Sequence, residues 1–95
     1  MNGRPTPKGT VVVRHSDGSP LAWESDPPHI RLYAWFLSNL HPGRDLPVDR
    51  KKAAKDTGLT TGEVLEAMTR LVREGDLKAV RDRRQELFRL VIRYE

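Results

Sequence analysis

The chain of 95 residues contains no cysteine, few aromatic residues and no long apolar run. Without cysteine it has no disulfide framework, no thiolate nucleophile, no iron–sulfur cluster and no cysteine-containing zinc site. No stretch approaches the ~18–20 consecutive apolar residues of a membrane-spanning helix. Residues 1–8 lack the apolar core of a secretory signal. We therefore expect a cytoplasmic protein without a membrane segment.

Signatures of enzymes are also missing. The sequence has no phosphate-binding glycine loop, no nucleophile elbow and no zinc-protease helix motif. Ser16 and Asp17 follow His15, but this group lies between two apolar runs and is explained by turn formation. His15, His29 and His41 do not have the spacing of metal ligands. We expect no catalytic activity, no cofactor and no bound metal.

Size and charge favour a small binding domain. Seventeen lysines and arginines outnumber thirteen aspartates and glutamates, which gives a formal net charge of +4. Apolar residues make up 37% of the chain, so it has enough hydrophobic side chains for one small core. A domain of this length is too small for a deep catalytic cleft between two lobes.

The N-terminal quarter predicts a tail followed by a hairpin. Residues 1–9 contain two prolines and two glycines without apolar periodicity, which indicates a flexible tail. Residues 10–25 place Asp17 and Gly18 between two apolar runs, a pattern typical of a type I′ turn. Pro20 cannot donate to a strand ladder, so the second strand should be short and at a sheet edge.

A first helix is predicted after this hairpin. Asp26 precedes two prolines and should cap a helix that runs to about Leu40. One apolar stripe has helical spacing and consists of Ile30, Tyr33, Ala34, Leu37 and Leu40. Further large apolar residues lie outside that stripe, namely Leu32, Trp35 and Phe36. Because the helix is apolar over most of its circumference, either the hairpin or a second copy of the chain must cover it.

This surplus of apolar surface leads us to expect a homodimer. The β-branched strand of the hairpin and the outer apolar side of the first helix are the expected contacts. We predict an interface that contains Val11, Val13, Trp23, Leu32, Trp35 and Phe36.

Two more helices and two strands are predicted in the remainder. Residues 46–48 form a short extended piece, and Asp49 then caps a helix over 50–57 that ends at Gly58. Thr60 and a glutamate three residues later form a capping box for a third helix. Its buried stripe contains Val64, Met68 and Leu71, flanked by Ala67 and Val72.

The third helix ends at Gly75 and is followed by a hairpin. The pattern predicts strands over 77–81 and 87–94 with a connection over 82–86. Four side chains share one face of the second strand: Phe88, Leu90, Ile92 and Tyr94. We expect this face to pack on the helices.

Residues 48–60 resemble the winged helix-turn-helix family of bacterial DNA-binding regulators, especially its MarR-like and replication-initiator-like members. The likeness continues in several apolar residues and one glycine after residue 60. The positions that carry the likeness beyond residue 60 are Val64, Met68, Leu71, Gly75 and Leu77. The resemblance implies an α+β fold over residues 26–95: a winged helix-turn-helix of three helices and a C-terminal two-stranded wing. The N-terminal β-hairpin is an addition to it.

The resemblance also implies double-stranded DNA as the partner, and association with the nucleoid. The second helix would cross the phosphate backbone, the third would enter the major groove, and the wing would reach the flanking minor groove or backbone. The role would be that of a transcriptional regulator, or of a plasmid or phage replication or partition factor. The expected DNA-binding residues are Arg50, Lys51, Lys52, Lys55, Thr60, Thr61, Leu65, Thr69, Arg70, Arg73, Arg81, Arg83 and Arg84.

Two alternatives remain open at this point. Four acidic residues lie along or just after the third helix, and its first turn offers few base-reading side chains, which favours a winged-helix module that binds a protein in a larger assembly. The excess of basic residues is equally compatible with a nucleoid or RNA-binding protein without sequence preference.

Overall fold

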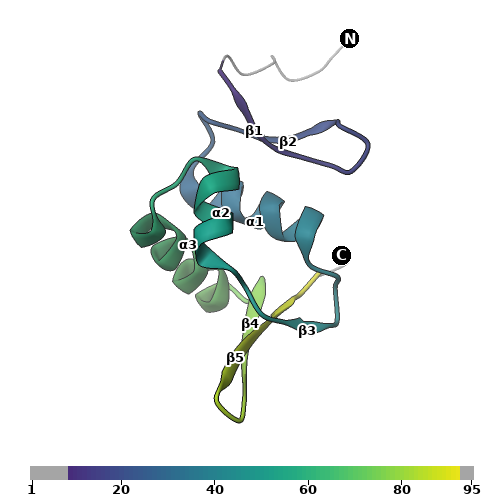
Figure 1. The fold of residues 1–95 in the computed structure, drawn as a ribbon, viewed down its shortest axis with the longest axis vertical. Coiled ribbons are helices and arrows are strands. Elements are labelled where there is room, and N and C mark those ends of the chain that lie inside the picture. The colour runs from purple at the N-terminus through teal and green to yellow at the C-terminus, as the bar shows by residue number, and fades with distance from the viewer. Residues whose placement is uncertain (1–8, 93–95) are drawn as a thin grey trace.

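The computed structural model describes residues 9–92, and these form an α+β fold with three helices and two sheets (Figure 1). The elements are β1 (Val11–Arg14), β2 (Pro20–Trp23), α1 (Pro28–Asn39), β3 (Asp45–Leu46), α2 (Arg50–Thr57), α3 (Thr61–Arg73), β4 (Leu77–Asp82) and β5 (Gln85–Leu90). This order confirms the predicted succession of elements. Residues 1–8 of the predicted tail over residues 1–9, and the position of Tyr94, lie outside the described residues.

The two hairpins lie at opposite ends of the long axis, with the helices between them (Figure 1). Strands β1 and β2 form a two-stranded antiparallel sheet. Strands β3, β5 and β4 form the second sheet in that order, and all its pairings are antiparallel. The short strand before α2 therefore joins the C-terminal hairpin into a single three-stranded sheet.

The connection in the N-terminal hairpin differs from the prediction. It is a five-residue loop in which His15 N donates to Ser19 O at 2.8 Å, and Oδ1 of Asp17 accepts hydrogen bonds from the amide and hydroxyl of Ser19. Gly18 is the only residue of this loop with a positive φ, at 91°. A type I′ turn needs positive φ at both central residues, so that prediction was wrong. Pro20 does open a short edge strand, as predicted.

The predicted cap of the first helix was wrong as well. The residue that precedes α1 is Pro27, and no side chain caps the helix. Oδ2 of Asp26 instead accepts a 2.8 Å hydrogen bond from the backbone of Trp23. The carboxylate of Asp26 therefore binds the end of β2, where the amide of Trp23 is a donor only three residues away. The helix ends at Asn39, one residue before the predicted limit.

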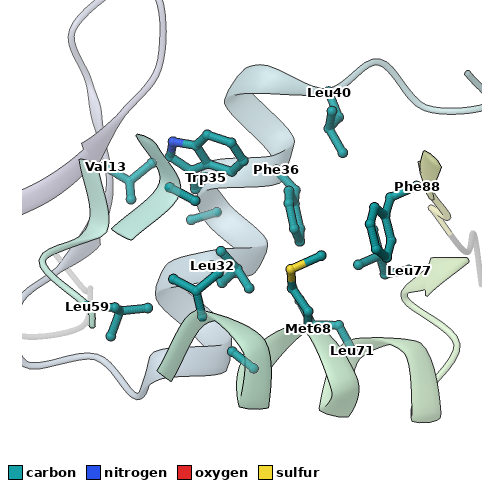
Figure 2. Packing of buried hydrophobic residues seen from close by; sticks show 14 of the residues in the cluster. Val13, Leu32, Trp35, Phe36, Leu40, Leu59, Met68, Leu71, Leu77 and Phe88 are labelled. Carbon is teal, nitrogen blue, oxygen red and sulfur yellow. The ribbon is translucent and has the colours of Figure 1, made fainter. Parts of the chain in front are cut away.

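The buried face of α1 is the one formed by Leu32, Trp35 and Phe36, each at most 4% exposed (Figure 2). This face contacts both strands of the N-terminal hairpin, α2 and α3, so the chain covers it without a second copy. The predicted stripe is confirmed in part, since Ala34 and Leu40 are buried, whereas Ile30 and Leu37 are exposed.

These contacts correct the predicted dimer interface. Val13 lies in the same core as Leu32, Trp35 and Phe36, so none of the four is available to a partner in the folded chain (Figure 2). The other two residues of the predicted interface, Val11 and Trp23, are half-buried. The homodimer itself stays a prediction.

The predicted ends of α2 are confirmed. Asp49 accepts a hydrogen bond from Lys52 N at 3.1 Å, and Gly58 adopts the left-handed conformation with φ of 73°. Ala53 and Thr57 are fully buried, and the hydroxyl of Thr57 donates to the carbonyl of Ala53 at 2.6 Å. Small side chains on this face allow α2 to pack closely against its neighbours.

The predicted start and core face of α3 are confirmed. Thr60 and Glu63 form both hydrogen bonds of the capping box. Val64, Met68 and Leu71 are buried. Met68 and Leu71 point towards α1 and the sheet, where the hydrophobic cluster includes Leu77 and Phe88 (Figure 2). This single cluster fixes the position of α3 relative to the C-terminal hairpin.

The C-terminal hairpin is tighter than predicted. Asp82 and Gln85 are strand partners, so only Arg83 and Arg84 form the turn, and Arg83 has φ of 58°. The connection expected over 82–86 was therefore too long, since β5 begins at Gln85 and ends at Leu90. Two of the side chains predicted to share the inner face of this strand are buried, namely Phe88 and Leu90.

Candidate nucleic-acid interface

The turn of the C-terminal hairpin carries three arginines. Arg83 and Arg84 form the turn and Arg81 precedes it on β4, and all three are exposed. Within residues 9–92, no carboxylate lies within ion-pairing distance of any of them. The turn projects from the molecule beyond the helices (Figure 1). This places positive charge on the most protruding part of the C-terminal half.

Two lysines of α2 form a second unpaired group. Lys51 and Lys55 are one helical turn apart and exposed, opposite the buried alanines of this helix. Neither forms an ion pair within the described part of the chain. They could therefore bind an external anion without first losing a partner.

Lys52, by contrast, is already paired. Its Nζ lies 3.0 Å from Oδ2 of Asp56, and that oxygen also accepts a hydrogen bond from Nε1 of Trp35 at 2.9 Å. The Trp35 hydrogen bond is the main reason why the pKa of Asp56 lies below its ordinary value, and Lys52 adds to the effect. This lysine therefore belongs to a structural contact between α1 and α2.

Arg50 connects α2 to the C-terminal hairpin. Its Nη2 lies 2.9 Å from Oε1 of Glu86 on β5, across 36 residues of sequence. Glu86 is also the strand partner of Arg81, although these two side chains do not form an ion pair. The pair is well exposed and contributes little to stability. It does place the start of α2 beside the hairpin.

Of the two basic residues of α3, one forms an ion pair and the other does not. Nε of Arg70 lies 2.8 Å from Oε1 of Glu74, and this hydrogen bond is the first cause of the lowered pKa of Glu74. Arg73 is exposed and forms no ion pair with any described residue. Of the two arginines predicted on this helix, Arg73 alone presents an unneutralised charge.

Two of the three threonines predicted to bind DNA use their hydroxyls in hydrogen bonds to the backbone of α3. Oγ1 of Thr60 accepts from the backbone of Glu63, and the hydroxyl of Thr69 donates to the carbonyl of Leu65 at 2.9 Å. Thr61 is exposed, and its side chain makes no hydrogen bond within residues 9–92. The outer side of α3 therefore offers Thr61 and the apolar Leu65, but few free donors.

Sequence reasoning missed a groove between α3 and the C-terminal hairpin, which we name the α3–hairpin groove. It lies where the exposed side of α3 faces β4 and β5, and Arg50 closes one side. Its lining residues are Arg50, Leu65, Met68, Thr69, Val72, Ala79, Glu86 and Phe88. Val72 was predicted to flank the buried stripe of α3, and that prediction was wrong, because Val72 is exposed like Leu65. The available signal is that Leu65 and Val72 are seven residues apart, which places them on one side of the helix.

A second arginine–carboxylate pair is structural. Nε and Nη2 of Arg89 donate to the two carboxylate oxygens of Asp45 at 2.8 and 3.2 Å, which fixes β3 on β5. The hydrogen bond from Arg89 is the main cause of the lowered pKa of Asp45. This arginine is therefore not a candidate for nucleic-acid contact.

Other kinds of site receive no support in the described residues. No group of three or more histidine or acidic side chains is placed to hold a metal ion in residues 9–92. The longest helix described has 13 residues, and none is long and apolar enough to cross a membrane.

Comparison of the chain with protein-family models, with curated proteins and with solved structures found no match.

Proposed function

We propose that this protein binds double-stranded DNA as a winged helix-turn-helix protein. In this proposal α2 and α3 are the helix-turn-helix, and the β4–β5 hairpin is the wing that follows the flanking backbone or minor groove. The order of elements supports it, because a capped helix, a glycine turn and a second capped helix are followed directly by a hairpin. The biological role would be transcription regulation, plasmid or phage replication, or partition.

One observation carries the proposal. Five of the cations that have no carboxylate partner within residues 9–92 lie on α2 and on the protruding hairpin turn, whereas Arg50 and Arg89 use their carboxylate partners to join elements of the fold. Duplex DNA gains affinity from cations that replace its condensed counterions, and an unpaired cation does this without breaking an ion pair. The unpaired set on these two elements consists of Lys51, Lys55, Arg81, Arg83 and Arg84.

The same geometry indicates that affinity comes mainly from the phosphate backbone. Because Thr60 and Thr69 use their hydroxyls within α3 and Arg70 is paired, few groups remain to read base edges. We therefore expect a strong dependence on salt and a modest preference between sequences.

Fluorescence anisotropy of a labelled duplex, titrated with the protein at several salt concentrations, tests the proposal. Replacing Arg84 with Ala should weaken binding and reduce the slope of log affinity against log salt by about 0.9. Adding Arg83→Asn should reduce it by about the same amount again, and asparagine tolerates the positive φ of this position.

Arg14→Ala is the matched control, because it removes one exposed positive charge from the hairpin at the opposite end of the molecule (Figure 1). It should leave both affinity and slope close to wild type. Two results would reject the proposal: no duplex binding at about 50 mM salt, where even non-specific contacts are strong, or an equal loss for Arg14→Ala and Arg84→Ala.

A further inference from the structure

We propose that the α3–hairpin groove binds an acidic peptide segment of a partner protein, which inserts apolar side chains between α3 and the hairpin. This inference does not rest on DNA binding, because it concerns an apolar surface beside the basic residues of the hairpin turn. It assigns to the chain a second ligand of a different chemical class.

The groove exposes apolar surface that the fold itself does not cover. Leu65 is 44% exposed and Val72 is 38% exposed, and both lie on its α3 side. Met68 and Phe88 are buried beneath them and belong to the core, so the base of the groove is rigid. Ala79 lines the opposite side without filling it, because its side chain is a single methyl group. An apolar side chain of a partner would therefore find contacts on both sides.

The charge around the groove selects an acidic ligand. Arg50 and Glu86 neutralise each other where α2 meets the hairpin. Arg81 lies on the same face of β4 as Ala79, since side chains alternate along a strand, and it has no carboxylate of its own among the described residues. Arg50 and Arg81 against the single carboxylate of Glu86 give this side of the groove one positive charge in excess.

The lining itself is less suited to nucleic acid. Thr69 is the hydroxyl-bearing residue of the groove, and its hydroxyl already donates to the carbonyl of Leu65. Arg50 is held by Glu86, whose carboxylate repels phosphate. An acidic peptide satisfies both features of this surface, because its carboxylates meet Arg81 while its apolar side chains cover Leu65 and Val72.

A displayed library of random peptides, selected on the immobilised full-length protein, tests this directly. The enriched peptides should combine aspartate or glutamate with large apolar residues. A fluorescent synthetic copy of one such peptide should bind the wild-type protein and lose affinity by about tenfold or more when Leu65 and Val72 are both replaced by Ser. Arg81→Gln should weaken its binding and reduce the salt dependence.

The chain offers a matched control for the apolar pair. Ile30 and Leu37 are also exposed, also lie seven residues apart on a helix, and do not line the groove. Replacing both by Ser should leave binding of the peptide unchanged. Amide chemical shifts of the wild-type protein provide a second readout, and the peptide should move the signals of Leu65, Thr69 and Ala79.

Three results would overturn the proposal: no enrichment of peptides, enrichment of basic or uncharged ones, or equal loss in both Ser pairs. If no peptide is enriched but duplex DNA loses affinity for the Leu65 and Val72 pair, the groove belongs to the DNA interface and this inference is rejected. The anisotropy experiment on Arg84 is independent, so failure of the peptide proposal does not imply failure of DNA binding.

Discussion

The indole Nε1 of Trp35 donates a 2.9 Å hydrogen bond to Oδ2 of Asp56, which joins the middle of α1 to the end of α2. The same oxygen accepts a hydrogen bond from Lys52. A second contact lies nearby, because Arg31 donates to the carbonyl of Thr57 at 3.1 Å. The position of α2, and with it the direction of its exposed lysines, therefore depends on polar contacts with α1 as well as on the apolar core.

Asp56 should make the stability of the fold sensitive to acid. Its pKa in the folded state is lowered, first by Trp35 and then by Lys52, relative to about 3.9 in an unfolded chain. The resulting stabilisation is fully present above the unfolded pKa and is lost as the pH falls through the folded pKa. Asp56→Asn keeps an acceptor for Trp35 but cannot titrate. The free energy of unfolding in urea should therefore decline less steeply below about pH 4 in this variant.

Asp82→Asn is the control for that experiment. Asp82 is exposed, and its side chain makes no hydrogen bond or ion pair among residues 9–92. Its acid profile should match that of the wild-type protein. If Asp56→Asn gives the wild-type profile too, the contact with Trp35 does not perturb the carboxylate.

Sequence patterns predicted those features of the fold that depend on neighbours in the chain. Asp49, Gly58 and Thr60 act within four residues of their partners, and their predicted roles at the helix ends are confirmed. Asp26 shows the limit of such reasoning. Its carboxylate had two possible donors close in sequence, the start of the helix and Trp23 N, and the path of the chain decided between them.

The buried face of α1 could not be predicted for a different reason. The helix has apolar residues on two sides, and periodicity alone does not say which side meets the rest of the chain. Of the residues in question, Phe36 is in the core whereas Leu37 is exposed. The Arg50–Glu86 pair and the α3–hairpin groove were missed because both join residues far apart in sequence.

The capping box of α3 allows two neighbouring threonines to be compared. Oγ1 of Thr60 accepts from the amide of Glu63 at 3.1 Å, so Thr60→Ala should lower the free energy of unfolding by about 1 kcal/mol. Thr61 is exposed and makes no such bond, so Thr61→Ala should change it by less than about 0.5 kcal/mol. Urea denaturation followed by circular dichroism measures both. Equal losses would show that the cap does not stabilise the helix.

Two glycines should respond in opposite directions to replacement by alanine. Gly58 has φ of 73°, so Gly58→Ala should cost about 1 kcal/mol through the backbone, although its new Cβ would meet Arg31 and Val12 only at 3.6 and 3.8 Å. Gly62 lies in α3, and a Cβ there would meet nothing nearer than Oγ1 of Thr60 at 3.8 Å. Gly62→Ala should therefore stabilise the protein by roughly 0.5–1 kcal/mol. The same urea experiment checks both signs, and a gain for Gly58→Ala would contradict the role of its positive φ.

Removing the carboxylate of Glu86 should tighten the proposed binding to DNA. Oε1 of Glu86 lies 2.9 Å from Nη2 of Arg50, and the strand ladder places it opposite Arg81. Glu86→Gln leaves Arg50 without its ion-pair partner and removes the negative charge on the strand opposite Arg81, so affinity for a duplex should rise and the salt slope should steepen by about 0.9 for each newly engaged cation. The fold should change little, because the pair is exposed on both sides. Glu24→Gln removes the same charge from an exposed residue beside the opposite hairpin and should leave the slope unchanged. An equal gain in both variants would mean that net charge, and not the position of Glu86, determines the effect.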